Sequence, residues 1–424
     1  MKKETKENTQ EEEIEPASKG VVFLFCFMLL TKGITACIFQ TTTYFFMLRI
    51  LDGKIEEANY LYTTLSTVKA ITKFIGVFIC GLAIDSQKMK LRTIMQIFTT
   101  FHTLGFIFSF FQNIHLLFIG NIFREFGAGY IIVVKVKLTF SKKQSSFALV
   151  CTVFAKIMGI IAGSLLSIFV IPKVEFKIGN FDVWYGNFPC LVSFTLYFII
   201  LILCSNLMTD KDDPIQILKR INKRKKEKSF WRNGFELCKN IAYLVILMFS
   251  IYFYMVVEAY KNYRSINYLH CYGFGVQWLG AMLLVAYTAK LFFMPAFKII
   301  IDHWQKIDFM MVIILPYIAF SLSQTTIGSL FCDSYLLSDM YVKMMFTAGY
   351  QIPPVLLIAK LVDNKMKGTA QSLCSMCQKL SAIIIGALGT IFVNHQEPFM
   401  FCLMLIGVFL VAIAIWKRQL FVNL

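Results

Sequence analysis

The chain has 424 residues, of which 57% are apolar and only 16% are charged, and its formal net charge is +17. A soluble domain carries about 25% charged residues, so the apolar surplus, which includes 43 Phe and 20 Met, excludes a water-soluble globular protein. Nucleic-acid binding is excluded as well, because Lys and Arg lie mostly in short gaps between apolar runs instead of covering a solvated face.

The chain begins with a polar segment, in which Lys2, Lys3 and Lys6 precede an acidic stretch. This segment has neither the apolar core nor the small-residue cleavage site of a signal peptide. We therefore predict a disordered cytosolic tail over residues 1–19.

Twelve apolar stretches of about 20 residues, the length that crosses a bilayer, follow the tail. Together they predict an all-α membrane protein of about twelve transmembrane helices. The predicted spans are Gly20–Phe46, Leu61–Ile84, Thr93–Gln112, Leu116–Val136, Ser145–Ile171, Phe188–Met208, Leu237–Ala259, Gly275–Lys298, Phe309–Thr326, Ser338–Ile358, Thr369–Val393 and Phe399–Trp416.

Basic residues gather in alternate gaps between the spans, most densely in the central gap after span six, whereas the gap Ile327–Leu337 has none. By the positive-inside rule, both termini and the central gap face the cytosol. The protein itself is expected in the plasma membrane or in an organelle membrane. The predicted domains are an N-terminal half (20–208), a basic cytosolic linker (209–236), a C-terminal half (237–416) and a short cytosolic tail (417–424). We expect the linker to bind anionic lipids, since apolar residues flank its basic run.

The two halves resemble each other in sequence. The run from Phe126 to Tyr130 in span four matches the run from Phe346 to Tyr350 in span ten. In spans five and eleven, a Lys and a Gly are separated by the same interval. These are Lys156 and Gly163 in the first half and Lys379 and Gly386 in the second. Two matches in the same order predict an internal repeat, and hence two pseudo-symmetric six-helix bundles.

The gap after span two carries a recognisable motif: Gly81, three residues, Asp85 and a basic turn that ends at Arg92. An echo follows span eight, with Asp302 in the equivalent place. The first copy resembles the signature of the major facilitator superfamily. The resemblance implies a secondary transporter working by alternating access, in which spans one, four, seven and ten surround the substrate pathway.

Three sites are candidates for conformational gating. Asp85 can accept from backbone N–H groups of a neighbouring helix end and pair with Arg92, in a latch that one conformation makes and the other breaks. The alternative is a solvated turn that only ends the helix. Asp302 holds the equivalent position in the second half. In span ten, Pro353 and Pro354 predict a local helix break, which is either a gating hinge or a tight packing point.

Several charged residues fall well inside the predicted spans, where each costs roughly 2.5–3.5 kcal/mol even on lenient insertion scales. Glu125 alone among them is acidic at depth, so internal pairing cannot neutralise the cations. Three explanations compete. Either the cations line an aqueous cavity and bind an anionic ligand, or some Lys are deprotonated or snorkel along apolar walls. In the third explanation, carbonyl groups at helix C-termini bind the cations, or the span boundaries are misplaced. The deep cations are Lys32, Lys69, Lys73, Arg124, Lys156 and Lys379.

Arg124 is the first candidate, because its guanidinium offers a two-pronged donor for carboxylate or phosphate. The alternative is a pair with a carboxylate on another helix; Glu125 is not expected to be the direct partner, since adjacent residues point about 100° apart. Lys69 and Lys73 share a helical face. Thr and Gln side chains of span one either orient a ligand or bond their own helix. The candidate substrate-binding residues are Lys32, Gln40, Lys69, Lys73, Arg124, Lys156, Lys343 and Lys379.

The sequence contains no nucleophile–base pair, phosphate-cradling loop or metal-ligand cluster, so we expect neither an enzyme nor a resident cofactor or metal. We predict a monomeric secondary transporter or exchanger for a small organic anion, carboxylated or phosphorylated, with a coupling ion such as a proton or sodium. One alternative is a transporter of a neutral or cationic solute in which the lysines are structural. Another is a non-transporting membrane scaffold.

Overall fold

The computed structural model describes residues 18–85, 89–139, 145–179, 181–208, 230–273, 275–303, 306–323, 357–358, 361–362, 367–392 and 396–421. Most of the predicted tail, linker and tenth span lie outside the described residues, and so do Lys343, Pro353 and Pro354. Asp85 and Asp302 are placed on helices, but their side chains are outside the description.

The N-terminal half is a group of long helices with one small hairpin. Short polar residues start two of these helices: Ser18 accepts a hydrogen bond from the backbone N–H of Val21, and Asn113 accepts from the N–H groups of His115 and Leu116. The elements are α1 (Lys19–Ile50), α2 (Ile55–Asp85), α3 (Leu91–Phe110), α4 (Ile114–Gly127), α5 (Tyr130–Thr139), α6 (Ser145–Phe169), η1 (Ile171–Lys173), β1 (Glu175–Ile178), β2 (Phe181–Trp184) and α7 (Phe188–Leu207).

The C-terminal half is helical throughout its described part. Its elements are α9 (Phe230–Cys238), α10 (Ile241–Tyr272), α11 (Val276–His303), α12 (Lys306–Ser323), α15 (Lys367–Ile391), α16 (Gln396–Trp416) and η3 (Arg418–Phe421). Every predicted span except the tenth overlaps a described helix, and eight described segments are long and apolar enough to cross a membrane. The prediction of an all-α membrane fold is confirmed.

The predicted span four corresponds to one apolar segment, Ile114–Val134, that is long enough to cross a membrane, but its helix is not continuous. A turn at Ala128 and Gly129 separates α4 from α5. The turn packs directly on neighbouring backbone, because a Cβ at Gly127 would meet the backbone of His102 and Phe98. Glycine therefore lets α3 approach closely at the point where the fourth span is interrupted.

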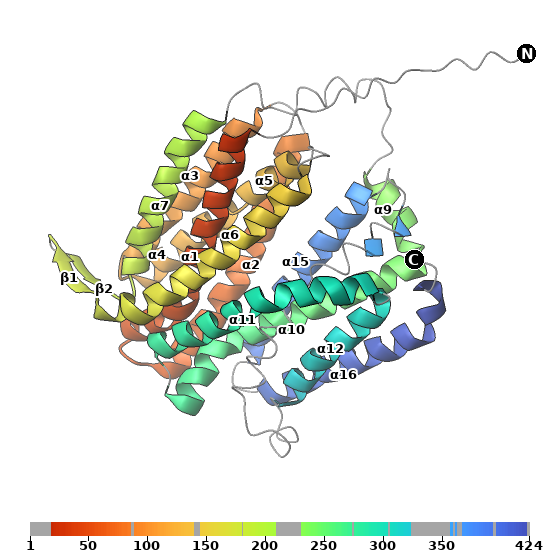
Figure 1. Cartoon of the computed structure of the whole chain (residues 1–424). Coiled ribbons are helices and arrows are strands. Elements are labelled where there is room, and N and C mark those ends of the chain that lie inside the picture. The colour runs from red at the N-terminus through yellow and green to blue at the C-terminus, as the bar shows by residue number, and fades with distance from the viewer. Residues whose placement is uncertain are drawn as a thin grey trace, which may run out of the picture.

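Each half has its own hydrophobic core. In the N-terminal half, residues of α1, α3, α5 and α7, including Phe98, Tyr130 and Tyr197, form one buried cluster. In the C-terminal half, residues of α10, α12, α15 and α16, including Tyr243 and Phe253, form another. Figure 1 shows the two helical groups side by side, with the first in red to yellow-green and the second in green to blue.

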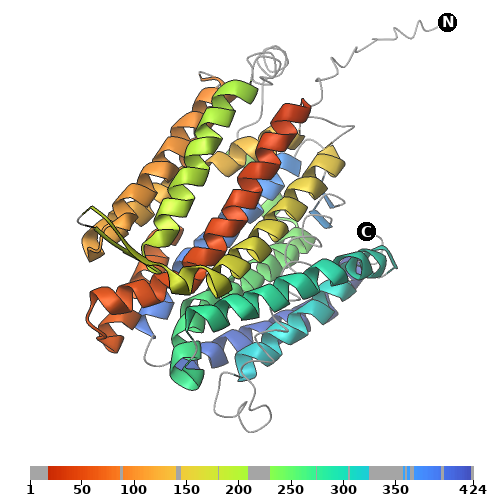
Figure 2. The ribbon, with the colours of Figure 1, turned by 60° about the vertical axis from the view of Figure 1, so that its left-hand side comes forward.

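The halves meet through α1 and α6 against α11, and through α2 against α15 (Figure 2). Ile38 of α1 packs with Leu279 of α11, and the hydroxyls of Thr67 in α2 and Thr390 in α15 lie 3.5 Å apart. These contacts lie on the side of the molecule where α1 has its C-terminal end and α2 its N-terminal end. Toward the ends at which α6 and α15 begin, the two groups diverge in Figure 1.

Candidate substrate site between the two halves

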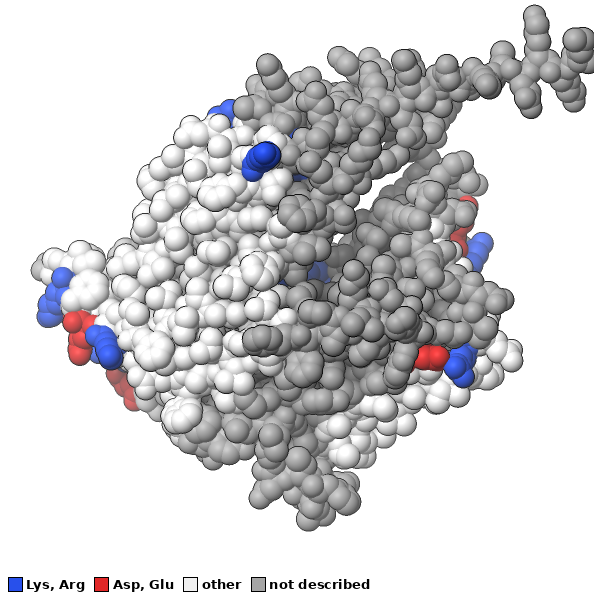
Figure 3. Space-filling model, in the orientation of Figure 1, with Lys and Arg blue, Asp and Glu red and all other residues white. Residues whose placement is uncertain are grey.

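A cluster of charged residues lies where the two halves face each other. Lys32 of α1 interacts electrostatically with Lys73 of α2, Lys156 of α6, Glu125 of α4 and Lys379 of α15. Four of these residues come from the N-terminal half and one from the C-terminal half. Figure 3 shows Lys or Arg atoms within the hollow beside the N-terminal helices.

Glu125 is the acidic centre of the cluster. Its Oε2 lies 3.3 Å from Nζ of Lys73, and its Oε1 lies 3.7 Å from Nε of Arg124. The expectation that Glu125 would not contact Arg124 directly was therefore wrong. Successive residues do point apart on a helix, but the long side chains of Arg and Glu bend far enough to bring their charged ends together.

Arg124 is buried within the N-terminal half, with only 6% of its surface exposed. Its Nη2 donates to Oδ1 of Asn121 at 2.5 Å, and its guanidinium carbon lies 4.4 Å from the ring centre of Phe39. Its Nη1 has no hydrogen-bond partner within the described part of the chain. The guanidinium is thus held by one amide, one carboxylate and the aromatic rings of Phe39 and Phe106.

His102 fixes the backbone at this point. Its Nδ1 lies 2.5 Å from the carbonyl oxygen of Arg124, so this nitrogen donates and Nε2 carries no proton in the neutral ring. The ring also packs against Tyr197, whose hydroxyl lies 2.8 Å from that of Tyr130. The last turn of α4 is therefore anchored to α3 and α7, which restricts where Arg124 can place its side chain.

The candidate lysines are more accessible than Arg124. Lys156 is exposed, and Lys32, Lys69 and Lys379 are half-buried. Two of them lie over aromatic rings of their own half: Nζ of Lys32 is 5.9 Å from the ring centre of Tyr130, and Nζ of Lys379 is 5.3 Å from that of Tyr254. The rings offer a favourable surface to the ammonium groups without neutralising them.

The polar residues of α1 contribute less to the site than their density suggests. Thr42 and Thr43 donate to the carbonyl oxygens of Ile38 and Phe39 in their own helix. Thr41 donates to the carbonyl of Ile38 and also meets the hydroxyl of Ser167 in α6, at 3.0 Å. For these threonines, the interpretation as helix-bonded residues is the one that holds. Gln40 is half-buried on the same helix.

Glu258 of α10 was not predicted as part of the site. It interacts electrostatically with Lys73 and so brings a carboxylate of the C-terminal half to the cluster. Tyr254 precedes it by four residues, and the two share a helical face. A search for acidic residues near the helix edges, paired with aromatic residues one turn away, would have singled out this face.

The cluster remains strongly basic. Among the described residues it contains six basic side chains against the two carboxylates of Glu125 and Glu258. Five of the basic residues come from the N-terminal half (Lys32, Lys69, Lys73, Arg124 and Lys156) and one, Lys379, comes from the C-terminal half. Of the gating candidates, Asp85 is the last residue of α2 and Arg92 lies half-buried in the first turn of α3.

Solved transporter structures share this fold over nearly the whole chain. One is a POT family transporter in complex with a thioalcohol-conjugated peptide, with a TM-score of 0.72 at 11% identity, over 95% of this chain and 96% of that one. Another is a D-xylose–proton symporter, with a TM-score of 0.69 at 13% identity, over 94% and 97%. A third is a nucleoside transporter, with a TM-score of 0.66 at 13% identity, over 95% and 100%.

The chain therefore has the fold of these solved transporters, which agrees with the transporter architecture that the resemblance at Gly81–Arg92 implied. All three of these neighbours are themselves transporters or symporters. No protein-family model and no curated protein sequence matches the chain.

Proposed function

We propose that this chain is a secondary transporter that moves a small organic anion, carboxylated or phosphorylated, by alternating access between its two halves. The observation that carries the proposal is the excess of basic side chains over carboxylates among the described residues of the cluster between the halves. An anion entering this cluster supplies the missing negative charge. Keeping so many cations in a membrane-spanning region is costly, and a ligand-binding role accounts for that cost.

Within the cluster, the residues divide into two groups. Glu125 holds Lys73 and Arg124, so these three residues form a paired network that shapes the site. We assign direct contact with the anion to Lys156 and Lys379, which occupy equivalent places in the repeat. Lys32, which interacts electrostatically with both, and Lys69, one helical turn from Lys73, complete this group. An anion held by one lysine from each half would draw the halves together.

This arrangement favours the exchange of one anion for another across the membrane over net transport, in which the empty transporter must return. When the site is empty, the lysines of the two halves repel each other, and closing the halves brings them closer in a region of low dielectric constant. A bound anion removes that penalty. The loaded transporter can therefore change its conformation more readily than the empty one, so one anion leaves as another returns.

Other parts of the chain have roles in the proposal that follow from the sequence. Both termini and the basic linker face the cytosol, and the linker binds anionic lipids. Asp85 with Arg92 and the equivalent Asp302 act as gating contacts. Gln40 and Lys343 line the substrate path, and Pro353 with Pro354 forms a hinge in span ten. The protein works as a monomer. A proton or a sodium ion serves as coupling ion where transport of the anion is not balanced by the return of a second anion.

A transporter of a neutral solute is the second candidate. Glu125 neutralises part of the cluster, and Tyr130 and Tyr254 accommodate Lys32 and Lys379, so the lysines have structural surroundings. The sugar and nucleoside transporters that share the fold fit this alternative. The two candidates differ in which ligand stabilises the protein.

A thermal-shift screen of the purified protein separates them. We expect carboxylated or phosphorylated metabolites to raise the unfolding temperature, whereas the matched uncharged sugars, nucleosides and amides leave it unchanged. A ligand at 100 times its dissociation constant stabilises the folded state by about 2.7 kcal/mol, which such a screen detects. Stabilisation by the uncharged compounds alone would contradict the anion proposal and support the second candidate.

A further inference from the structure

The hairpin between α6 and α7 is amphipathic. In its antiparallel register Phe176 pairs with Val183 and Ile178 pairs with Phe181. Because directly paired residues point to the same side of a hairpin and side chains alternate along a strand, these four apolar residues share one face. The other face carries Glu175, Lys177, Asp182 and Trp184.

The apolar face is anchored at its inner edge and open beyond it. Phe181 packs against Phe110 and Phe111 at the end of α3, and Phe176 packs against Phe188 at the start of α7. Yet 45% of Phe176, 48% of Ile178 and 52% of Phe181 remain exposed. These three large side chains form an apolar patch that the described residues cover only in part.

The polar face is fixed at its base and solvated beyond. Trp184 is buried between Phe46 and Arg49 of α1, with the guanidinium carbon of Arg49 at 4.1 Å from its ring centre. Lys177 and Asp182 form a 3.2 Å ion pair that is largely exposed. An exposed ion pair of this kind belongs in water or among lipid headgroups, not in hydrocarbon.

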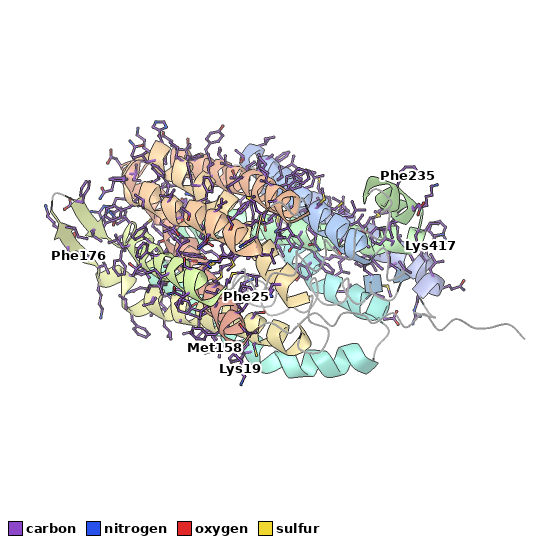
Figure 4. The ribbon with its side chains drawn as sticks, turned by 90° about the horizontal axis from the view of Figure 1, so that it is seen from above. Lys19, Phe25, Met158, Phe176, Phe235 and Lys417 are labelled. Carbon is purple, nitrogen blue, oxygen red and sulfur yellow. The ribbon has the colours of Figure 1, made fainter. Side chains whose placement is uncertain are left out.

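The hairpin projects sideways from the helical bundle. Figures 1 and 2 show it standing away from the helices, and Figure 4 shows Phe176 at the outer edge while Phe25 lies in the interior. It starts from the membrane face at which α1 ends and α2 begins. The neighbouring helices α3 and α7 are both long and apolar enough to cross a membrane, and α3 carries further exposed apolar side chains such as Ile107.

We propose that this hairpin is a lipid-binding element that lies flat on the bilayer interface, with Phe176, Ile178 and Phe181 among the upper acyl chains. Its apolar patch is continuous with the surface that α3 and α7 present to lipid, so the bilayer already borders it. Large apolar side chains on one face of an amphipathic element, Phe among them, are buried at the boundary between headgroups and acyl chains. Lys177 and Asp182, on the opposite face, meet headgroups and water.

Fluorescence quenching by brominated lipid tests the placement. Phe176→Trp adds a Trp on the apolar face, and Lys177→Trp adds one on the neighbouring polar position as the matched control. Each variant is reconstituted in phosphatidylcholine vesicles with or without bromine atoms near the headgroup end of the acyl chains. The signal of the unaltered protein, which has five native Trp, is subtracted.

We expect brominated lipid to remove most of the added fluorescence at position 176 and little of it at position 177. Ile178→Trp should repeat the result for position 176. Equal quenching at positions 176 and 177, or protection of both, would overturn the proposal. The proposal would also be overturned if the Trp at position 176 were protected from quenching and this protection disappeared on dilution of the protein in excess lipid. That result would indicate that a second copy of the chain covers the apolar patch. None of these outcomes depends on what the protein transports.

Discussion

Replacing Lys156 or Lys379 by Gln is expected to weaken the binding of the same anion by about tenfold or more. Each substitution leaves a polar side chain that is one atom shorter and removes its charge. A hydrogen bond to a charged group contributes about 1.5–3 kcal/mol, and 1.4 kcal/mol corresponds to a factor of ten in affinity. Since Lys156 lies on α6 and Lys379 on α15, the two results together test whether one ligand spans both halves.

The measurement is the dissociation constant of the anion that gives the largest thermal shift, determined for each purified variant. Lys54→Gln is the matched control, because Lys54 lies at an exposed turn in a solvated pair with Glu57. We expect the control to bind as the unaltered protein does. Unchanged affinity in both site variants, with normal folding, would remove these lysines from the site. A loss in one variant only would place the ligand in a single half.

Replacing Gly159 by Val is expected to prevent stable folding of the N-terminal half. A Cβ at Gly159 would fall on the carbonyl oxygen of Leu30, and a Cβ at Gly33 would fall on the carbonyl oxygen of Lys156. Helices α1 and α6 are therefore in backbone contact, which only glycine permits. Overpacking costs about 1–3 kcal/mol even where side chains can move aside, and here the obstacle is backbone.

Separating the two helices would also break the side-chain contacts between them. Cys37 and Ser164 lie 3.2 Å apart, and the Thr41 and Ser167 hydroxyls lie 3.0 Å apart. The measurement is the unfolding temperature and the fraction of protein that remains monodisperse in detergent. Gly81→Val is the control, because no described atom lies within 4 Å of the added carbon. If both variants were equally stable, the close approach of α1 and α6 would not be needed for the fold.

Much of the helical framework was predictable because long apolar runs recur along the chain. Long apolar runs such as those of α1 and α16 can only be buried in lipid or protein, and their lengths place the spans directly. The repeat of Lys156 and Lys379 identified two residues that the structure brings into one electrostatic cluster. Both inferences rest on properties that tertiary contacts do not alter.

Other features depend on contacts that a sequence does not display. The hairpin was missed because its two strands have only four residues each, too few for an alternating pattern to stand out. The contact between Arg124 and Glu125 depends on side-chain torsion angles, which helical geometry alone does not determine. Glu258 lies near the edge of its predicted span, and its interaction with Lys73 exists only because α10 and α2 face each other.

Counterflow in proteoliposomes tests the anion-transport proposal most directly. Vesicles containing the purified protein are loaded with an anion selected by the thermal-shift screen, and uptake of the same labelled anion is followed with and without the internal pool. We predict saturable uptake that is faster when the internal anion is present, and that is lost in the Lys156→Gln and Lys379→Gln variants. Uptake of uncharged solutes but not of anions, or anion uptake no greater than in protein-free vesicles, would contradict the proposal.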